Sequence, residues 1–389
     1  MLRRSNDNGA TWSAPVTIAD GIGGNNNVYN AGFGDAAVVA DRESGKVLVM
    51  CVGGKQVFAY ATESSHNAMC KITSNDNGAT WDAPKDVTAQ FITGGNALFP
   101  EAYSMFFGSG RILQSTMVKK GNYYRIYGAL LIKHPSSTYT GNCNYVVYSD
   151  DFGDTWNILG GSVNAGMCCN GGDEPKVEEL PNGNIVLSSR KSNGRYFNVF
   201  TFTDVENGLG TWGNAVASNN QTGGISYGSN ACNGEIYKLN AINNSTKEEC
   251  CIMLQSIPTG NGRSNVSIYY KEIDGEAAYT PVTFAQNWTK GLEVSAMNSA
   301  YSTMTLQSDN NMGFLYEEHP GDNYSYCIVY VPLSIEEITG GAYSLSQSTG
   351  IDRVEVDTVG NKIYDLQGRE LRTPSKGIYI INGKKQIIK

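Results

Sequence analysis

Arginine is the residue type in this chain with the clearest potential for ligand binding. The sequence has 389 residues and a formal net charge of -8, so its overall field would weakly repel an anion. Capture of an anionic ligand would depend on a few arginines in a pocket, because the planar guanidinium fork binds a carboxylate bidentately. Lysine and arginine form no cluster long enough to follow a phosphate backbone, which argues against a nucleic-acid partner.

Metal chemistry has little support in the sequence. The three histidines, His66, His134 and His319, share no metal-binding spacing. The nine cysteines show neither a C-x-x-C spacing nor a disulfide framework, so we expect most of them to be small core residues. No apolar run is long enough for a membrane-spanning helix. We therefore expect no metal, no cofactor and no transmembrane segment.

A repeated octapeptide indicates the scaffold that must position any site. SNDNGATW occurs at 5–12 and 74–81, SDDFGDTW occurs at 149–156, and a degenerate copy covers 204–212. Such intervals suit one four-stranded β-blade each. In each copy the aspartate can accept hydrogen bonds from the following backbone N–H groups, the threonine hydroxyl can close the turn, and the tryptophan can pack between blades. A calcium loop is the competing interpretation, but no glutamate closes a twelve-residue loop.

These copies resemble the Asp-box, or BNR, repeats of the bacterial sialidase (neuraminidase) family. The resemblance implies an all-β fold, a six-bladed β-propeller with a short C-terminal β appendage. We expect the propeller to cover residues 1–342 and the β tail to cover 343–389. Asp-box propellers also occur in other glycosidases, sorting receptors and assembly factors, so the function has to be argued from residues outside the repeats.

Four further segments resemble those that carry the functional residues of sialidases. The segment at 32–50 contains Asp35, 172–190 contains Glu174 and Arg190, 260–270 contains Arg263, and 298–318 contains Tyr301 and Glu317. These residues follow the order of their counterparts in the family. Each motif is weak alone, and together with three good repeats they are fairly specific.

The resemblance implies a role for each of these residues. Arg190 and Arg263 would hold the carboxylate of a sialic acid. Tyr301 would be the nucleophile, because a neutral tyrosine avoids the repulsion that a carboxylate nucleophile would meet, and Glu174 would take its proton. Asp35 would contact a sugar hydroxyl.

The family pattern departs from this sequence at its start. In sialidases a first triad arginine and the acid/base aspartate precede the first Asp box, which begins here at Ser5. Arg3 and Arg4 lie too close to that box to replace the arginine, because crossing a blade takes about five or six residues. We therefore expect an N-terminally truncated chain with an open edge on the last blade. Glu317 would orient the arginine that is absent.

Structural roles remain open for several of these residues. Tyr301 is one of 23 tyrosines and could be a cross-strand packing residue. Glu174 could belong to a solvated acidic loop with Asp173, Glu178 and Glu179. Arg190 has Lys191 and Arg195 close by, and one of these basic residues could be a surface charge. Arg263 and Asp35 are also compatible with ordinary turns.

The predicted function is that of an exo-α-sialidase, a glycoside hydrolase acting on sialylated glycans or glycoproteins with retention of configuration. A non-catalytic sialoglycan-binding propeller, or an Asp-box glycosidase or adhesin for a neutral glycan, are the alternatives. The tail resembles the C-terminal tails of exported Bacteroidetes proteins, which indicates a periplasmic, cell-surface or secreted location, although the chain shows no signal peptide.

Overall fold

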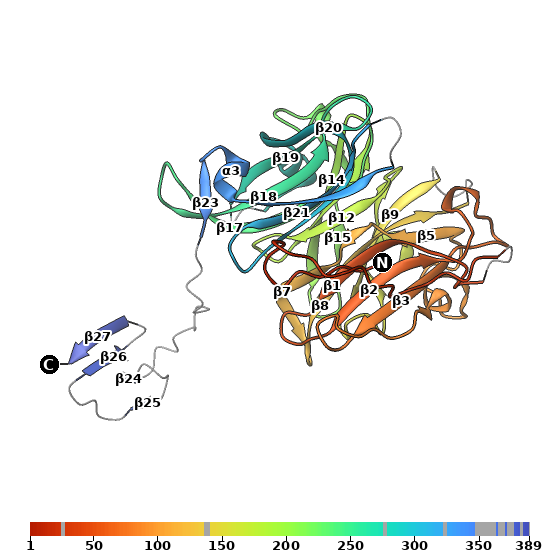
Figure 1. Ribbon diagram of the computed structural model, residues 1–389, viewed down its shortest axis with the longest axis horizontal. Coiled ribbons are helices and arrows are strands. Elements are labelled where there is room, and N and C mark those ends of the chain that lie inside the picture. Colours follow the sequence, from red (N-terminus) through yellow and green to blue (C-terminus); the bar gives the residue numbers. More distant parts are fainter. Residues whose placement is uncertain are drawn as a thin grey trace. The chain divides into compact units, whose positions relative to one another are not determined.

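The computed structural model describes residues 1–24, 28–135, 141–274, 278–321 and 325–346, and four short strands beyond them (Figure 1). The chain divides into two compact units, Met1–Ser346 and Gln347–Lys389. The second unit contains a four-stranded sheet in the order β25-β24-β26-β27. Its strands are β24 (Ile363–Tyr364), β25 (Glu370–Leu371), β26 (Gly377–Ile381) and β27 (Lys384–Ile388).

Short strands joined by tight turns build the first two sheets of the first unit. The first sheet has the order β4-β3-β2-β1-β6, and the second has the order β10-β9-β8-β5 with β7 and β11 added to it. The strands are β1 (Phe33–Ala40), β2 (Val47–Gly53), β3 (Ala68–Ser74), β4 (Lys85–Asp86), β5 (Ser104–Phe107), β6 (Gly110–Arg111), β7 (Leu113–Lys120), β8 (Tyr123–Lys133), β9 (Asn142–Ser149), β10 (Asn157–Ile158) and β11 (Met167–Asn170).

The third and fourth sheets follow in chain order. The third has the order β12-β13-β14-β15 with β16 added, and the fourth has the order β22-β21-β20-β19-β18-β17-β23. The strands are β12 (Pro175–Glu179), β13 (Ile185–Lys191), β14 (Gly194–Asp204), β15 (Leu209–Trp212), β16 (Val216–Ala217), β17 (Ile236–Asn243), β18 (Glu249–Pro258), β19 (Ser264–Ile273), β20 (Thr289–Leu306), β21 (Met312–His319), β22 (Cys327–Leu333) and β23 (Tyr343–Leu345).

One long strand joins two blade-like halves in the fourth sheet. β20 pairs with β19 through its first part and with β21 from Asn298 to Leu306, with register shifts between. The described residues of the first unit thus supply five blade-like antiparallel groups of strands, together with the first repeat.

Helical structure is confined to short connections. These are η1 (Phe58–Tyr60), η2 (Ala89–Thr93), α1 (Val163–Gly166), η3 (Ser218–Asn220), α2 (Pro281–Ala285) and α3 (Ile335–Thr339). In the part of the chain that the structure describes, no helix is long and apolar enough to cross a membrane. The all-β prediction is confirmed.

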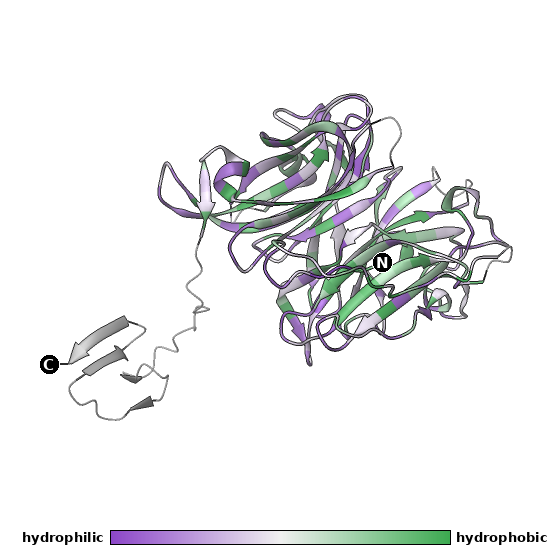
Figure 2. Cartoon of the chain, viewed as in Figure 1, coloured by the Kyte–Doolittle hydropathy of each residue, from purple (hydrophilic) through white to green (hydrophobic). Residues whose placement is uncertain are grey.

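Hydrophobic clusters fill the spaces between consecutive sheets. Leu48 of the first sheet and Tyr145 of the second share one buried cluster. Val146 of the second sheet and Leu187 of the third share another, and a third cluster joins Phe197 of the third sheet to the fourth. Hydrophobic residues follow these strands while hydrophilic ones gather in the connections (Figure 2). Consecutive sheets therefore bury side chains against one another, as the blades of a propeller do.

The three good repeats form the same hydrogen-bonded hairpin. In the second copy the Asp76 carboxylate accepts the Thr80 backbone N–H at 2.8 Å and the Thr80 hydroxyl at 2.6 Å. Ser74 Oγ donates to Asp76 at 2.9 Å and accepts the Gly78 N–H at 2.9 Å. The first and third copies repeat this pattern. In the degenerate copy Asp204 bonds Asn207 instead.

The first repeat reaches the last part of the propeller. Tyr330 Oη donates a hydrogen bond to Asn8 O at 2.6 Å, and the rings of Trp12 and Tyr330 meet edge to face at 5.2 Å. β22 ends the order of its sheet, and among the described residues no strand pairs with its outer edge. Ile328 on this strand is 62% exposed.

Acid should weaken the hairpins, and Asp76→Asn tests this. Hydrogen bonds from the Thr80 side chain and backbone lower the pKa of Asp76 to about 2 from 3.8. A carboxyl group whose pKa is lower in the folded protein than in the unfolded chain stabilises the fold at pH values above its unfolded-state pKa. This stabilisation is lost as the pH falls through its folded-state pKa. We expect Asp76→Asn to lower the melting temperature at pH 7 and the difference from wild type to shrink between pH 4 and pH 2. The exposed Asp20→Asn is the control. A difference that is constant with pH would contradict this account.

Candidate active site

A β-hairpin brings Glu174 and Arg190 together. Glu174 directly precedes β12, Arg190 lies in β13, and Pro175 pairs with Ser189 in the antiparallel register. The Arg190 backbone N–H donates to Glu174 O at 3.1 Å. Arg190 Nη1 also donates to Glu174 Oε2 at 2.7 Å. The carboxylate is 4% exposed, so this charged partner offsets most of its cost of burial.

Tyr301 completes the centre of the site. Its hydroxyl donates to the other carboxylate oxygen of Glu174, Oε1, in a short hydrogen bond. Arg190 Nη1 lies 3.3 Å from Tyr301 Oη. Burial, and then the charge of Glu174, raise the pKa of Tyr301 well above its usual range. The resting tyrosine is therefore neutral, and its proton already points at a base.

A second guanidinium lies beside the tyrosine ring. Arg263 Cζ is 5.9 Å from the centroid of the Tyr301 ring, and Arg263 Nε donates to Ala231 O at 3.1 Å. The Arg263 backbone has a φ of 65°, a region that non-glycine residues occupy where their surroundings over-determine it. The Ser299 N–H donates to Arg263 O at 2.8 Å, which ties this loop to the strand of Tyr301.

Asp35 and Glu317 lie around this centre. Asp35 Oδ1 accepts the Ser109 hydroxyl at 3.2 Å, and the Asp35 backbone has a φ of 49°. Asp35 is reached by solvent, yet desolvation by the surrounding protein and, less strongly, the charge of Glu174 raise its pKa. Glu317 Oε2 accepts the backbone N–H of Tyr301 at 3.2 Å. The structure thus brings the six predicted residues together, while their chemical roles stay predictions.

The alternative of a solvated acidic loop is wrong. Glu174, Glu178 and Glu179 are each at most 4% exposed. Glu178 pairs with Arg111 at 2.7 Å, and Glu179 accepts the Thr116 N–H at 2.7 Å. The sequence left this alternative open because the partners of Glu178 and Glu179 come from segments far away in the sequence.

Arg195 is also not a surface charge. Its side chain is fully buried, and its nitrogens donate to Ser188 and to the carbonyl of Cys232. Arg190 and Arg195 are a cross-strand pair in β13 and β14. Arg190 is thus the basic residue of this hairpin that contacts Glu174 and Tyr301.

One missed neighbour of the site is Asp173. Its carboxylate lies 3.3 Å from Arg190 Nε. Burial raises the pKa of Asp173, Arg190 opposes this shift and the charge of Glu174 adds to it. Arg190 therefore stands between two adjacent acids.

A second ionic layer, which the sequence analysis missed, lies behind the first. Lys176 follows Glu174 by two residues, so both project from the same face of the strand. The Lys176 ammonium donates to Ser109 O and lies 3.6 Å from Glu235 Oε2. Glu235 Oε2 accepts the Thr303 hydroxyl at 2.8 Å, and Thr303 follows Tyr301 by two residues. The alternating charged residues Glu174, Lys176 and Glu178 were the signal in the sequence that could have indicated this layer.

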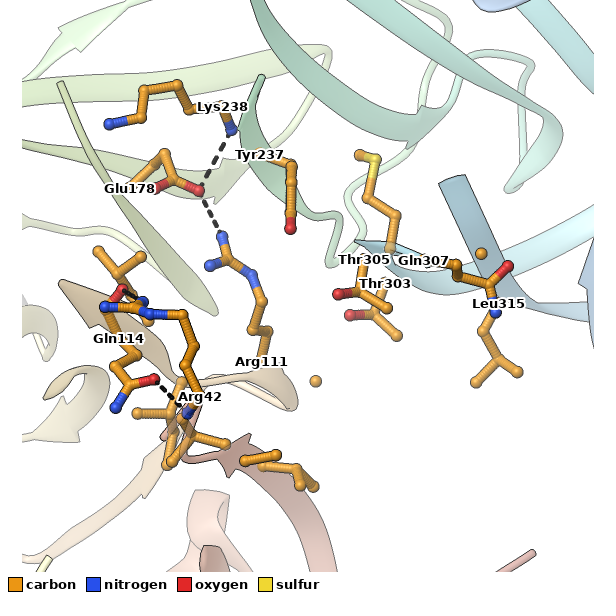
Figure 3. A pocket seen from close by; sticks show the side chains of 18 of the residues that line it. Arg42, Arg111, Gln114, Glu178, Tyr237, Lys238, Thr303, Thr305, Gln307 and Leu315 are labelled. Atoms are coloured by element: carbon orange, nitrogen blue, oxygen red, sulfur yellow. Dashed lines mark hydrogen bonds and ion pairs between the residues drawn. The ribbon is translucent and has the colours of Figure 1, made fainter. Parts of the chain in front are cut away.

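A cavity of about 630 Å³ lies beyond this layer (Figure 3). Glu178 accepts hydrogen bonds from Arg111 Nη2 at 2.7 Å and from the Lys238 backbone at 3.3 Å, and Thr303, Thr305 and Gln307 line the same cavity. None of the six predicted site residues lines it. We therefore assign the predicted chemistry to the Glu174 and Tyr301 end.

Removing one charge of the second layer should cost more than removing both. Lys176 and Glu235 are each 1% exposed, and breaking a buried pair costs about 3–5 kcal/mol where it leaves a buried charge without a partner. Arg111 Nη2 lies 3.7 Å from Glu235 Oε1 and stays as a cationic partner when Lys176 is removed. We expect Lys176→Met to lower the free energy of unfolding by about 3 kcal/mol, the lower end of this range, because Arg111 still faces Glu235. The double variant Lys176→Met/Glu235→Gln should lose clearly less. Urea unfolding measures both, and equal losses would contradict the pairing.

Comparison with known proteins identifies relatives for most of the chain. A family model described as a BNR repeat-like domain matches residues 1–316. A sialidase of Micromonospora viridifaciens is 27% identical over 340 residues, which cover 84% of this chain and 46% of the relative. The chain thus spans about half the length of that curated relative.

Solved structures of similar fold include two proteins from microbial sources. The Hadza microbial sialidase Hz136 gives a TM-score of 0.61 at 20% identity, covering 87% of this chain and 59% of its own. The intramolecular trans-sialidase of Ruminococcus gnavus gives 0.61 at 15% identity, covering 87% and 88%. Likeness at such identities concerns the fold, and it confirms the predicted β-propeller of the sialidase type.

Proposed function

Because the chain belongs to the family of BNR repeat-like domains, we propose that it is an exo-α-sialidase, which hydrolyses a terminal sialic acid from a glycoconjugate. The observation that carries the proposal is the contact of Tyr301 with Glu174 and Arg190. The tyrosine hydroxyl donates to a buried carboxylate, and one guanidinium contacts both groups. A neutral nucleophile of this kind suits a substrate whose anomeric carbon bears its own carboxylate, because it is not repelled by that charge. The likeness to a curated sialidase supports the same substrate class.

The proposed recognition step uses the two arginines. Arg190 Nη2 makes no hydrogen bond to any described residue, so it can meet a ligand carboxylate. Among the described residues Arg263 hydrogen-bonds through its Nε alone, which leaves its two terminal nitrogens for a ligand. Two guanidinium groups beside one tyrosine ring would fix the carboxylate and place the anomeric carbon near Tyr301 Oη.

The proposed chemical step moves one proton and exchanges one bond. Tyr301 gives its proton to Glu174 as its oxygen bonds the anomeric carbon, and the bond from that carbon to the leaving oxygen breaks. The leaving oxygen takes a proton from a general acid, which the resemblance to sialidases places before the first Asp box. Water then cleaves the tyrosyl-sugar bond, and two inversions give net retention.

The proposed substrates are sialylated glycans or glycoproteins outside the cytoplasm. The support for this location is the resemblance of the C-terminal tail to those of exported proteins. β26 and β27 in this tail form an antiparallel pair.

Release of a fluorogenic aglycone from an α-sialoside tests the function. The fluorogenic aglycone leaves as a stabilised phenolate, so its departure does not need the general acid. We therefore expect turnover by the wild-type chain and its abolition in Tyr301→Phe. In Glu174→Gln we expect kcat/KM to fall about 10²–10⁴-fold, because general base catalysis is worth that much. Tyr316→Phe is the matched control, since it removes the hydroxyl of a buried tyrosine on the neighbouring strand β21.

Two other outcomes would point elsewhere. Binding of free sialic acid without turnover would indicate a sialoglycan-binding propeller in place of an enzyme. Turnover or binding that does not depend on Arg190 and Arg263 would indicate a neutral glycan and overturn the proposal.

A further inference from the structure

We propose that the segment Tyr227–Ala231 is a clamp that holds Arg190 and Arg263 at the separation that a ligand carboxylate requires, with Asn230 as its central positioning residue. The inference rests on the proposed function, because it concerns the same carboxylate. It assigns a role to residues that make no hydrogen bond to Tyr301 or Glu174 within the described part of the chain. The segment is called the clamp below.

The two arginines need such a connection because they belong to different sheets. Arg190 lies near the end of β13 in the third sheet, and Arg263 lies between β18 and β19 in the fourth. Two guanidinium forks bind one carboxylate well only when both are held to within about 0.5 Å of the productive geometry. Flexing between the sheets would spoil that alignment.

One side of the clamp holds the turn that follows Arg190. The Asn193 N–H donates to Asn230 O at 3.0 Å, and the Tyr227 N–H donates to Asn193 O at 3.4 Å. The Tyr227 hydroxyl lies 2.6 Å from Gly194 O and 3.0 Å from Lys191 O. Asn193 has a φ of 63°, a conformation that asparagine adopts readily in turns.

The other side of the clamp holds the loop of Arg263. Asn230 Nδ2 donates to Gly260 O at 2.5 Å. Further backbone hydrogen bonds run between Gly228 and Thr259 at 3.0 Å and between Gly262 and Ser229 at 3.2 Å. Ser229 N–H donates to the Asn261 side chain at 2.7 Å.

The clamp also touches the guanidinium itself. Arg263 Nε donates to Ala231 O at 3.1 Å, which restricts the plane of the fork. Asn230 therefore bonds one arginine loop with its side chain and the turn after the other arginine with its backbone carbonyl. One residue sets the spacing of both.

The test compares ligands that differ only in the carboxylate. Binding of N-acetylneuraminic acid and of its C1 carboxamide is measured by calorimetry for the wild type, Asn230→Ala and Tyr227→Phe. We expect each variant to weaken binding of the acid about tenfold, the equivalent of roughly one net hydrogen bond. Binding of the carboxamide should hardly change. Asn220→Ala, an exposed asparagine of the same connection, should leave both affinities unchanged.

Double variants separate positioning from a general loss of structure. If Asn230 acts through Arg263, Asn230→Ala should add less than twofold to the effect of Arg263→Ala, whereas independent effects would multiply. In the same way, Tyr227→Phe should weaken binding of the acid less than twofold further when Arg190→Ala is already present. Melting temperatures of the single variants show that the compared proteins are folded.

The outcomes distinguish this inference from the proposed function. A wild type that binds neither ligand would overturn both. A wild type that prefers the acid, with Asn230→Ala and Tyr227→Phe keeping the whole preference, would overturn the clamp alone. Equal weakening of acid and carboxamide would also overturn it, because the clamp would then be structural support only.

Discussion

The rest of the site depends on one buried carboxylate with two partners. Glu174 is almost completely removed from water, and the hydrogen bonds from Arg190 and the Tyr301 hydroxyl offset the cost of burying its polar oxygens. Burial, and then the contact with Glu174, raise the pKa of Tyr301, and the same contact directs its proton at Glu174. The position of the hairpin from β12 to β13 relative to β20 is therefore an electrostatic requirement as well as a consequence of packing.

Further ion pairs along β12 support the position of this hairpin. Glu174, just before β12, and Lys176 and Glu178 within it alternate along the chain, and the partner of each comes from a different segment. Thr303 on the strand of Tyr301 reaches the partner of Lys176. Hydrophobic clusters hold neighbouring sheets together, while these ion pairs fix which residues meet at their inner edges.

The sequence predicted the features that short segments contain. The Asp-box hairpins are visible because aspartate, threonine and glycine bond within eight residues, and Glu174 and Arg190 belong to one hairpin. The all-β propeller followed from the repeats. Contacts between distant segments were not predictable from the sequence. Glu235 and Asn230 meet their partners only when different sheets come together. The buried state of Glu178 and Arg195 was missed for the same reason.

The contact between Tyr330 and Asn8 has a consequence for how the chain folds. It joins residues 322 positions apart, whereas the clusters between sheets join segments that follow one another. During synthesis each sheet can dock on the one made before it, and closing so long a loop must wait until almost the whole propeller has emerged. The hairpin at the N-terminus is thus made first and meets its partner last, which makes this closure the slowest step expected from the topology.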